Sequence, residues 1–274
     1  MTDLTPKPAP GPDQPPIPVR LVTFNIHHGV GEDGVHDLAR TARVLAEADA
    51  DVICLQEVDR HYGPRSEGVD QALLLSRALD LQLAFGASID QPPRPGSRER
   101  REYGNALLSR LPLLISDVHP LPGTGEPRSA LRTMIELDGG ALWVTTTHLT
   151  NQGADERAAQ ARALAALHTE PMETGVVVGD LNAGPDAPEL GPLRERFTDA
   201  WHLAQARADH PRDAGRSFLR REAGRTFSAR HPRERIDQVW VSAGVTVTSA
   251  EVLDARGSSD HHPLLVELAV RSGV

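Results

Sequence analysis

The chain has 274 residues, a formal net charge of −9, 39% hydrophobic residues and few aromatic ones. This composition is ordinary for a globular protein, and the acidic balance disfavours tight non-specific binding of nucleic acid, which depends on Lys and Arg neutralising phosphates. A single cysteine, Cys54, excludes an intramolecular disulfide and a cysteine-based zinc cluster. Because Cys54 lies in an apolar run, we expect an inert thiol in the core.

Residues 1–18 are rich in proline and lack the charged-then-apolar pattern of a signal peptide. They predict a disordered leader, followed by a single domain over residues 19–274, since no interdomain linker or short repeat is found. No stretch approaches the ~18 apolar residues that a membrane-spanning helix needs. The expected location is the cytoplasm.

The predicted elements begin with a buried strand over residues 19–26, bounded by the Pro-rich segment and by two glycines. A helix over 36–48 follows, with Asp37 available as its N-cap. The next elements are a strand over 51–56, a helix over 69–79, and strands over 81–89, 105–108, 113–118, 131–137 and 141–149. The sequence Asp138-Gly139-Gly140 predicts a hairpin between the last two strands.

The second half of the chain opens with the clearest helix, over 155–168, which is rich in alanine. A strand over 175–179 and a loop with a short helix over 185–196 come next. We expect the polar segment 204–224 to be a long surface excursion, with strands resuming at 236–241, 245–252 and 264–270. About ten strands mixed with about four helices predict one α/β domain in which two sheets pack together with helices outside.

Polar residues cluster at the ends of these predicted strands. Asn25 ends the first strand, Glu57 ends the second, and His148 lies near the end of the 141–149 strand. The other candidates follow or precede later strands: Asp180, Asn182, Asp237, Asp260 and His261. Sites commonly form at strand ends because a rigid sheet positions residues that the loops leave accessible.

These residue types match the requirements of phosphodiester hydrolysis. A hard cation held by oxygen ligands polarises the phosphoryl group, a base activates water, and neutral donors stabilise the developing negative charge. Carboxylates supply ligands or a base, imidazoles transfer protons or contact phosphate, and amides serve as donors or ligands. Such residues are common, so the residue types alone are weak evidence.

The motifs that carry these residues are stronger evidence as an ordered set. They are TFNIHHG (23–29), LQEV (55–58), YGNALLSR (103–110), THL (147–149), GDLN (179–182), RIDQVW (235–240) and SDHHP (259–263). From about residue 19 onward they resemble the endonuclease/exonuclease/phosphatase superfamily, which includes deoxyribonucleases, inositol-polyphosphate phosphatases and neutral sphingomyelinases. The resemblance implies a four-layer α/β/β/α sandwich of two packed mixed sheets flanked by helices, and the use of Mg²⁺ or Mn²⁺.

The same resemblance implies a role for each residue. Glu57 is similar to the principal metal ligand, with Asn25 and Asp260 supporting the metal. His148 is similar to a histidine that contacts the scissile phosphate or acts as general acid. Asp180 and Asn182 look like the pair that orients water and phosphate. His261 resembles the general base, and Asp237 is expected to orient it, although a purely structural role for Asp237 is equally consistent with the sequence.

Some positions depart from the family pattern or leave alternatives open. Some nuclease members have an acid two residues after the first Asn, whereas this chain has His27, which can contact phosphate or metal. His262 adds a second imidazole beside His261, and we expect only His261 to be catalytic. Tyr103 and Asn105 line the pocket or pack at a β-edge. Arg128 reaches an anionic substrate group or forms an exposed salt bridge.

The favoured function is therefore hydrolysis of a phosphodiester or phosphomonoester bond in a small or lipid-linked substrate. The alternative is a DNA or RNA nuclease of the same chemistry, for which the Arg-rich segments 94–101 and 216–235 offer phosphate contacts. A non-catalytic binding module is a third hypothesis, but it predicts missing site residues, and none of the main ones is missing. No obligate protein partner is inferred.

Overall fold

The computed structural model describes residues 15–168, 174–208 and 224–271, and its strands form two six-stranded sheets. In spatial order the first sheet consists of β11 (Val245–Val252), β12 (Leu264–Val270), β1 (Ile17–Asn25), β2 (Val52–Arg60), β4 (Arg101–Ser109) and β3 (Gln82–Gln91). The second consists of β5 (Leu113–Leu121), β6 (Arg128–Leu137), β7 (Gly140–His148), β8 (Gly175–Asp180), β10 (Asp237–Val241) and β9 (Thr198–Asp199).

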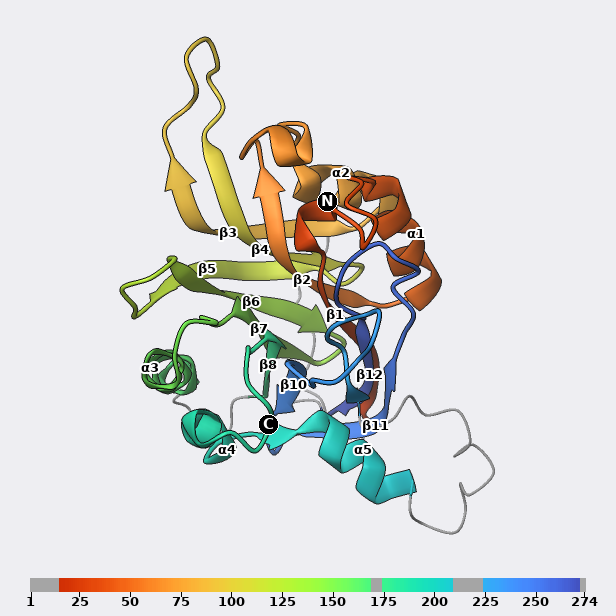
Figure 1. Ribbon diagram of the computed structural model, residues 1–274. Coiled ribbons are helices and arrows are strands. Elements are labelled where there is room, and N and C mark those ends of the chain that lie inside the picture. The colour runs from red at the N-terminus through yellow and green to blue at the C-terminus, as the bar shows by residue number, and fades with distance from the viewer. Residues whose placement is uncertain (1–14, 169–173, 209–223, 272–274) are drawn as a thin grey trace, which may run out of the picture.

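Helices cover the outer faces of both sheets (Figure 1). The α-helices are α1 (Leu38–Ala48), α2 (Gln71–Leu79), α3 (Ala154–Ala166), α4 (Gly191–Arg194) and α5 (Ala200–Ala208), and η1 (His27–Gly29), η2 (Pro64–Ser66) and η3 (Pro188–Leu190) are short 3₁₀ turns. Helices α1 and α2 pack on the first sheet, whereas α3 and α4 pack on the second. This four-layer sandwich confirms the predicted fold class.

Alternation along the strands builds separate apolar layers. In β1, Leu21 belongs to the core between the sheets, whereas Val22 and Phe24 belong to the core beneath α1 and α2. Because successive side chains of a strand point to opposite faces, a continuous apolar run can supply both layers. Cys54 is fully buried in the core between the sheets, as the apolar run around it predicts.

Helix α1 begins where the sequence predicts. The Asp37 side chain accepts a hydrogen bond from the Arg40 backbone N–H at 2.9 Å, so it satisfies one of the donors that a helix N-terminus leaves free. The predicted hairpin between β6 and β7 is also present, with Leu137 paired to Gly140. None of the helices in the described ranges is long and apolar enough to cross a membrane.

Some boundaries differ from the prediction. β1 begins at Ile17, two residues before the expected start of the folded part, because Ile17 and Pro18 pair with the end of β12. The first part of the segment expected to be a surface excursion belongs to α5, whose Trp201 and Ala204 join the core between the sheets. Residues 1–14 of the predicted leader and residues 209–223 lie outside the described residues.

The centre of each sheet holds one parallel pair of strands, β1 with β2 and β7 with β8. Parallel strands end at the same edge of a sheet, and ligand sites of α/β proteins form outside those carboxyl ends. Polar side chains join the two sheets near this edge, for example Gln56 of β2, which donates to Thr146 Oγ1 of β7 at 3.1 Å. The fold therefore brings four strand ends together.

Candidate active site

Asn25, the last residue of β1, links the two sheets at this edge. Its Nδ2 donates to Glu57 Oε1 at 3.0 Å and to Asp180 Oδ2 at 3.1 Å. Asp180 is the last residue of β8 and pairs in register with His148, the last residue of β7. One buried amide thus holds a carboxylate from each sheet, which is the convergence that the strand-end pattern predicts.

Asp180 lies at the centre of the cluster. Besides Asn25, its Oδ2 has His148 Nε2 at 3.4 Å and His261 Nε2 at 3.7 Å. Its Oδ1 accepts a hydrogen bond from the Asn182 backbone N–H at 2.9 Å. The Asp180 side chain is almost fully buried, so two imidazoles and an amide surround a carboxylate that bulk water does not reach.

Glu57 reaches the site from a β-bulge and not from a strand end, so the predicted end of the second strand is wrong. β2 continues to Arg60, and the register between β2 and β4 shifts between Leu55 and Val58. At this bulge Glu57 has φ +57°, which re-aims its side chain out of the normal alternation. Burial raises the pKa of Glu57, but His28, His148 and Asn25 together hold it well below its usual range, so the side chain is a carboxylate.

His261 and Asp237 form a buried pair. His261 Nδ1 donates to Asp237 Oδ2 at 2.8 Å, which leaves Nε2 facing Asp180. Burial disfavours the charged imidazole, but Asp237, Asp180 and Asp260 together raise the pKa of His261 to about 10. The ring of Phe227 packs against His261, with the ring centroids 4.7 Å apart.

His148 is held by Arg128, the first residue of β6. Arg128 Nη1 lies 3.0 Å from His148 Nδ1 and donates to it, since a guanidinium can only donate. Burial lowers the pKa of His148 to about 4, and the Arg128 charge adds to this effect while Asp180 opposes it. His148 is therefore neutral near pH 7, and its two predicted roles, phosphate contact and general acid, both stay predictions.

Asn182 completes this side of the cluster. Its amide lies 3.0 Å from His148 Nε2 and donates to the Leu149 carbonyl at 2.9 Å. Asn182 has φ +49°, a conformation that Asn tolerates better than most residues. Arg128, for which the sequence left a surface role open, is buried and belongs to the site.

Tyr103 and Asn105 lie on β4, next to the bulged strand. Tyr103 is buried, stacks against Tyr62 at 5.9 Å between ring centroids, and lies beneath the guanidinium of Arg65. Burial raises its pKa above the usual range, with the Glu57 charge adding to the effect. Asn105 Nδ2 donates to the Ser129 carbonyl at 3.0 Å, a bond between the sheets, so packing accounts for both side chains as well as substrate contact does.

His27 and Asp260 lie together at the more open side of the site. His27 Nδ1 lies 3.8 Å from Asp260 Oδ1 and 3.1 Å from the Val30 carbonyl. Sequence reasoning missed His28, whose Nδ1 lies 3.6 Å from Glu57 Oε2. The only signal for it was its place beside His27 in the first motif.

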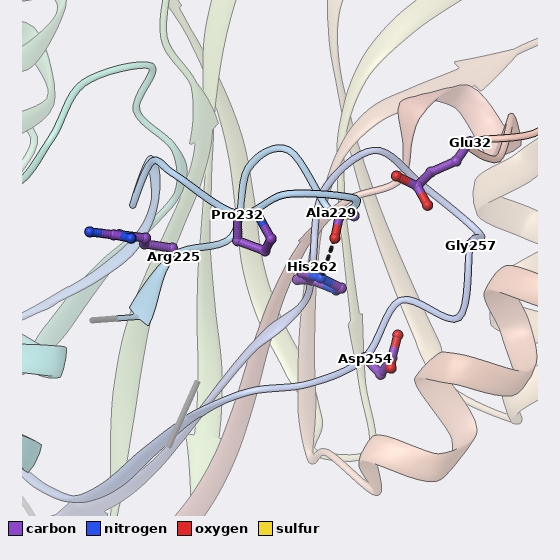
Figure 2. Close-up of a pocket in the computed structure, with 7 residues that line it drawn as sticks. All are labelled: Glu32, Arg225, Ala229, Pro232, Asp254, Gly257 and His262. Atoms are coloured by element: carbon purple, nitrogen blue, oxygen red, sulfur yellow. Dashed lines mark hydrogen bonds between the residues drawn. The ribbon is translucent and has the colours of Figure 1, made fainter. Parts of the chain in front are cut away.

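His262 does not join the cluster. Its Nδ1 accepts from the Ala255 backbone N–H at 3.1 Å, and its Nε2 donates to the Ala229 carbonyl at 3.0 Å (Figure 2). It borders a cavity of about 420 Å³ that is also lined by Glu32, Arg225 and Asp254. Of the two adjacent histidines, His261 faces Asp180 and His262 does not, and the catalytic role of His261 stays a prediction.

The donor set fits a divalent cation. One ligand atom each from His27, His28 and Glu57 lies within 4.8 Å of the others, and Asp180, Asp237 and His261 form a second such group. Asn25 and Asp260 border the first group. Within the described ranges, His28 Nδ1 is a buried nitrogen with no hydrogen-bond partner, so its lone pair is available to bind a cation.

A four-layer sandwich with carboxylates, imidazoles and amides gathered near the ends of its parallel strands is the arrangement expected of a metal-dependent phosphoester hydrolase. Residues 22–261 match the Endonuclease/Exonuclease/phosphatase family, and the chain belongs to this family. The resemblance drawn from the motifs is thereby confirmed.

Individual relatives agree with this assignment. The chain is 24% identical over 270 residues to Tyrosyl-DNA phosphodiesterase 2 from Xenopus tropicalis, an alignment that covers 91% of this chain and 66% of the length of that relative. Its structure is similar to that of an endonuclease/exonuclease/phosphatase from Beutenbergia cavernae, with a TM-score of 0.70, 26% identity, and coverage of 92% of this chain and 72% of that one. It is also similar to TDP2 from Caenorhabditis elegans, with a TM-score of 0.66, 18% identity, and coverage of 93% and 75%.

Proposed function

We propose that this hydrolase cleaves phosphodiester bonds of a small or lipid-linked phosphate ester with Mg²⁺ or Mn²⁺ as cofactor. The observation that carries the proposal is the convergence on Asp180 Oδ2, which Asn25, His148 and His261 approach from three different strands or loops. The similarity to a protein named as a phosphodiesterase supports it. A cytoplasmic location remains part of the proposal.

Glu57 is the principal metal ligand in this proposal, with Asn25 and Asp260 beside it. When bound, the cation polarises the phosphoryl group and steadies the leaving oxygen. Glu57 suits this role because its pKa is lowered and its carboxylate is already held by the Asn25 amide. His27 borders the same place and contacts either metal or phosphate.

His148, Asp180 and Asn182 address the phosphate and the attacking water. His148 contacts a phosphate oxygen in this proposal, and Arg128 holds its ring in place. Arg128 adds positive charge to the same place, and Tyr103 and Asn105 form the adjoining wall. Asp180 and Asn182 orient water toward the phosphorus because they are fixed to each other and to the end of β7.

His261 is the general base and Asp237 positions it. A base must be unprotonated, and the pKa of His261 is raised, so the rate increases with pH until His261 has lost its proton. Asp180 and Asp260 contribute to that rise, and cation binding by these carboxylates would bring the pKa of His261 down. We therefore place the acid limb of the pH–rate profile between the ordinary value of 6.5 and about 10.

A nuclease is the second candidate, and one feature of the molecule favours it. The hairpin between β3 and β4 projects beyond the first sheet (Figure 1). Between this hairpin and the segment 61–68 lies a cavity of about 490 Å³ whose lining includes Arg94 and Arg101 as well as Glu67 and Glu99. The two arginines offer contacts to phosphates of a nucleic acid, although the two glutamates balance their charge and the chain as a whole is acidic.

The test is hydrolysis of bis-p-nitrophenyl phosphate with Mg²⁺ or Mn²⁺ by the wild type, Glu57→Gln and, as a control, the exposed Glu195→Gln. Glu57→Gln keeps the shape but removes the charge, so we expect turnover to fall by roughly 10²-fold or more, with the control unchanged. Absence of turnover with either metal would refute the proposal. Metal-dependent plasmid nicking that falls steeply with salt would identify the nuclease instead.

A further inference from the structure

The segment around η1 is strained at the residues that face Glu57. His27 has φ +46° and His28 has φ +43°, and they are followed by Gly29 at φ +78°. A left-handed conformation is unfavourable for a non-glycine residue and persists only where the surroundings enforce it. Glu57 itself has φ +57°. Two neighbouring histidines and the glutamate opposite them therefore all adopt an unfavourable backbone conformation.

The surroundings hold this segment in place. Gln71 Nε2 donates to the His28 carbonyl at 2.7 Å, and the His27 backbone N–H donates to Asn25 Oδ1 at 3.0 Å. Gly29 has φ +78°, and a Cβ there would lie 3.0 Å from the side chains of both Gln71 and His36, so a larger residue would be strained. The backbone of this segment is thus held by the fold, and the two imidazoles also contact each other, with their ring centroids 4.5 Å apart.

Hydrogen bonding leaves one nitrogen of His27 free to bind a ligand. Nδ1 lies 3.1 Å from the Val30 carbonyl, and since a carbonyl can only accept, Nδ1 carries the proton of the neutral ring. Nε2 then has its lone pair available. This is the arrangement in which metal-binding histidines are oriented, with one ring nitrogen donating to a carbonyl and the other ligating.

His28 offers a second nitrogen next to the carboxylate. Its Nδ1 lies 3.6 Å from Glu57 Oε2, too far for a good hydrogen bond, and its side chain is 13% exposed. In the part of the chain that the structure describes, this nitrogen has no hydrogen-bond partner. A cation between Nδ1 and the carboxylate satisfies both groups.

We infer that His27 and His28 supply two imidazole ligands to the cation held by Glu57, and that the site therefore selects transition-metal dications over Mg²⁺. The inference rests on the proposed function for the presence of a cation at Glu57. Imidazole suits borderline metals such as Co²⁺ and Zn²⁺, whereas Mg²⁺ prefers oxygen ligands and keeps several waters. Affinities at a mixed nitrogen and oxygen site rise from Mn²⁺ to Co²⁺, so the expected order is Co²⁺, then Mn²⁺, then Mg²⁺.

The experiment measures ligation directly. Chelator-treated full-length protein is titrated calorimetrically with Mg²⁺, Mn²⁺ and Co²⁺, and pulsed electron paramagnetic resonance of bound Mn²⁺ detects ¹⁴N coupling from imidazole. We expect Mn²⁺ to bind roughly tenfold or more tightly than Mg²⁺, with a ¹⁴N signal. The signal and the preference should be lost in the double variant His27→Gln/His28→Gln and retained in His202→Gln, which changes an exposed histidine.

The outcomes separate this inference from the proposed function. Bound Mn²⁺ without ¹⁴N coupling, or coupling that survives in the double variant, overturns the inference while hydrolysis can still proceed. If the double variant fails to fold, the single variants His27→Gln and His28→Gln assign the signal, because His148 and His261 also lie at this centre and coupling that survives unchanged in both single variants overturns the inference. A ¹⁴N signal without hydrolysis of any ester supports the inference and refutes the proposed function. Absence of binding by all three ions overturns both.

Discussion

The Asp237→Asn substitution tests whether a buried carboxylate controls the proton on His261. Asp237 Oδ2 accepts from His261 Nδ1 at 2.8 Å, and both side chains are buried. Opposite charges about 4 Å apart interact by ~4 kcal/mol at an effective dielectric constant of about 20. At 1.36 kcal/mol per pKa unit this corresponds to about three units. We therefore expect the substitution to lower the pKa of His261 from about 10 to roughly 7.

An NMR titration of the histidine resonances in chelator-treated protein measures this shift. Asparagine still accepts a hydrogen bond from Nδ1, so the ring keeps its orientation and the change in pKa reports the lost charge. Asp199→Asn is the matched control, because Asp199 pairs with Arg235 at 2.7 Å and does not touch His261. A decrease of less than about one unit would refute the electrostatic argument. A shift in the titration without a matching shift in the pH–rate profile would remove His261 from the role of base.

Three further predictions follow from the buried groups. With wild-type protein, hydrolysis of bis-p-nitrophenyl phosphate should rise with pH between 6.5 and about 10 as His261 loses its proton, and a flat profile over this range would contradict a histidine base. The pKa of His148 is about 4 in the folded protein and 6.5 ordinarily, so the unfolded chain binds more protons between these values and the folded protein loses stability as the pH falls through them. Urea unfolding at pH 7 and pH 4.5 should show a loss about 2.4 kcal/mol larger for the wild type than for His148→Gln, and equal losses would disprove the assignment. Burial raises the pKa of the Cys54 thiol, so Ellman's reagent should label Cys54 only after unfolding, and rapid labelling of the native protein would contradict its place in the core.

Most of the fold could be predicted from short stretches of sequence, because the signals for strands, helix caps and turns depend on neighbouring residues. The apolar run that forms β1, the Asp37 cap of α1 and the Asp-Gly-Gly hairpin each depend on a few neighbouring residues. The eleven strand ranges expected from the sequence all correspond to strands of the structure, and the one strand added in the described residues is β9, which has only two residues. The last residues of helix α5 fall in the segment predicted to be a polar excursion, because the apolar residues of this helix contact the core without a clear helical stripe.

The site was predictable to the extent that its residues follow strand ends. Asn25, His148 and Asp180 are the last residues of β1, β7 and β8. The parallel pairing of β7 with β8 places His148 beside Asp180, and the packing of the two sheets brings Asn25 to them. Arg128 lacked such a signal. It is the first residue of β6, and its contact with His148 depends on the antiparallel register between β6 and β7, which the local sequence does not encode.

The backbone conformation of the site residues could not be predicted from the sequence, and several residues proposed to carry the chemistry have an unusual one. Glu57, His27, His28 and Asn182 all have positive φ, although none is a glycine. A residue type that rarely adopts this conformation gives no local sign that it will do so, because the cause lies in distant partners such as Gln71 and the β2–β4 bulge. The strain keeps two imidazoles and a carboxylate directed at one place before any cation arrives. If His27 and His28 bind the cation, this preorganisation spares the site a rearrangement when the cation binds. It is the physical reason to expect metal selectivity from this segment, which the strand-end pattern could not reveal.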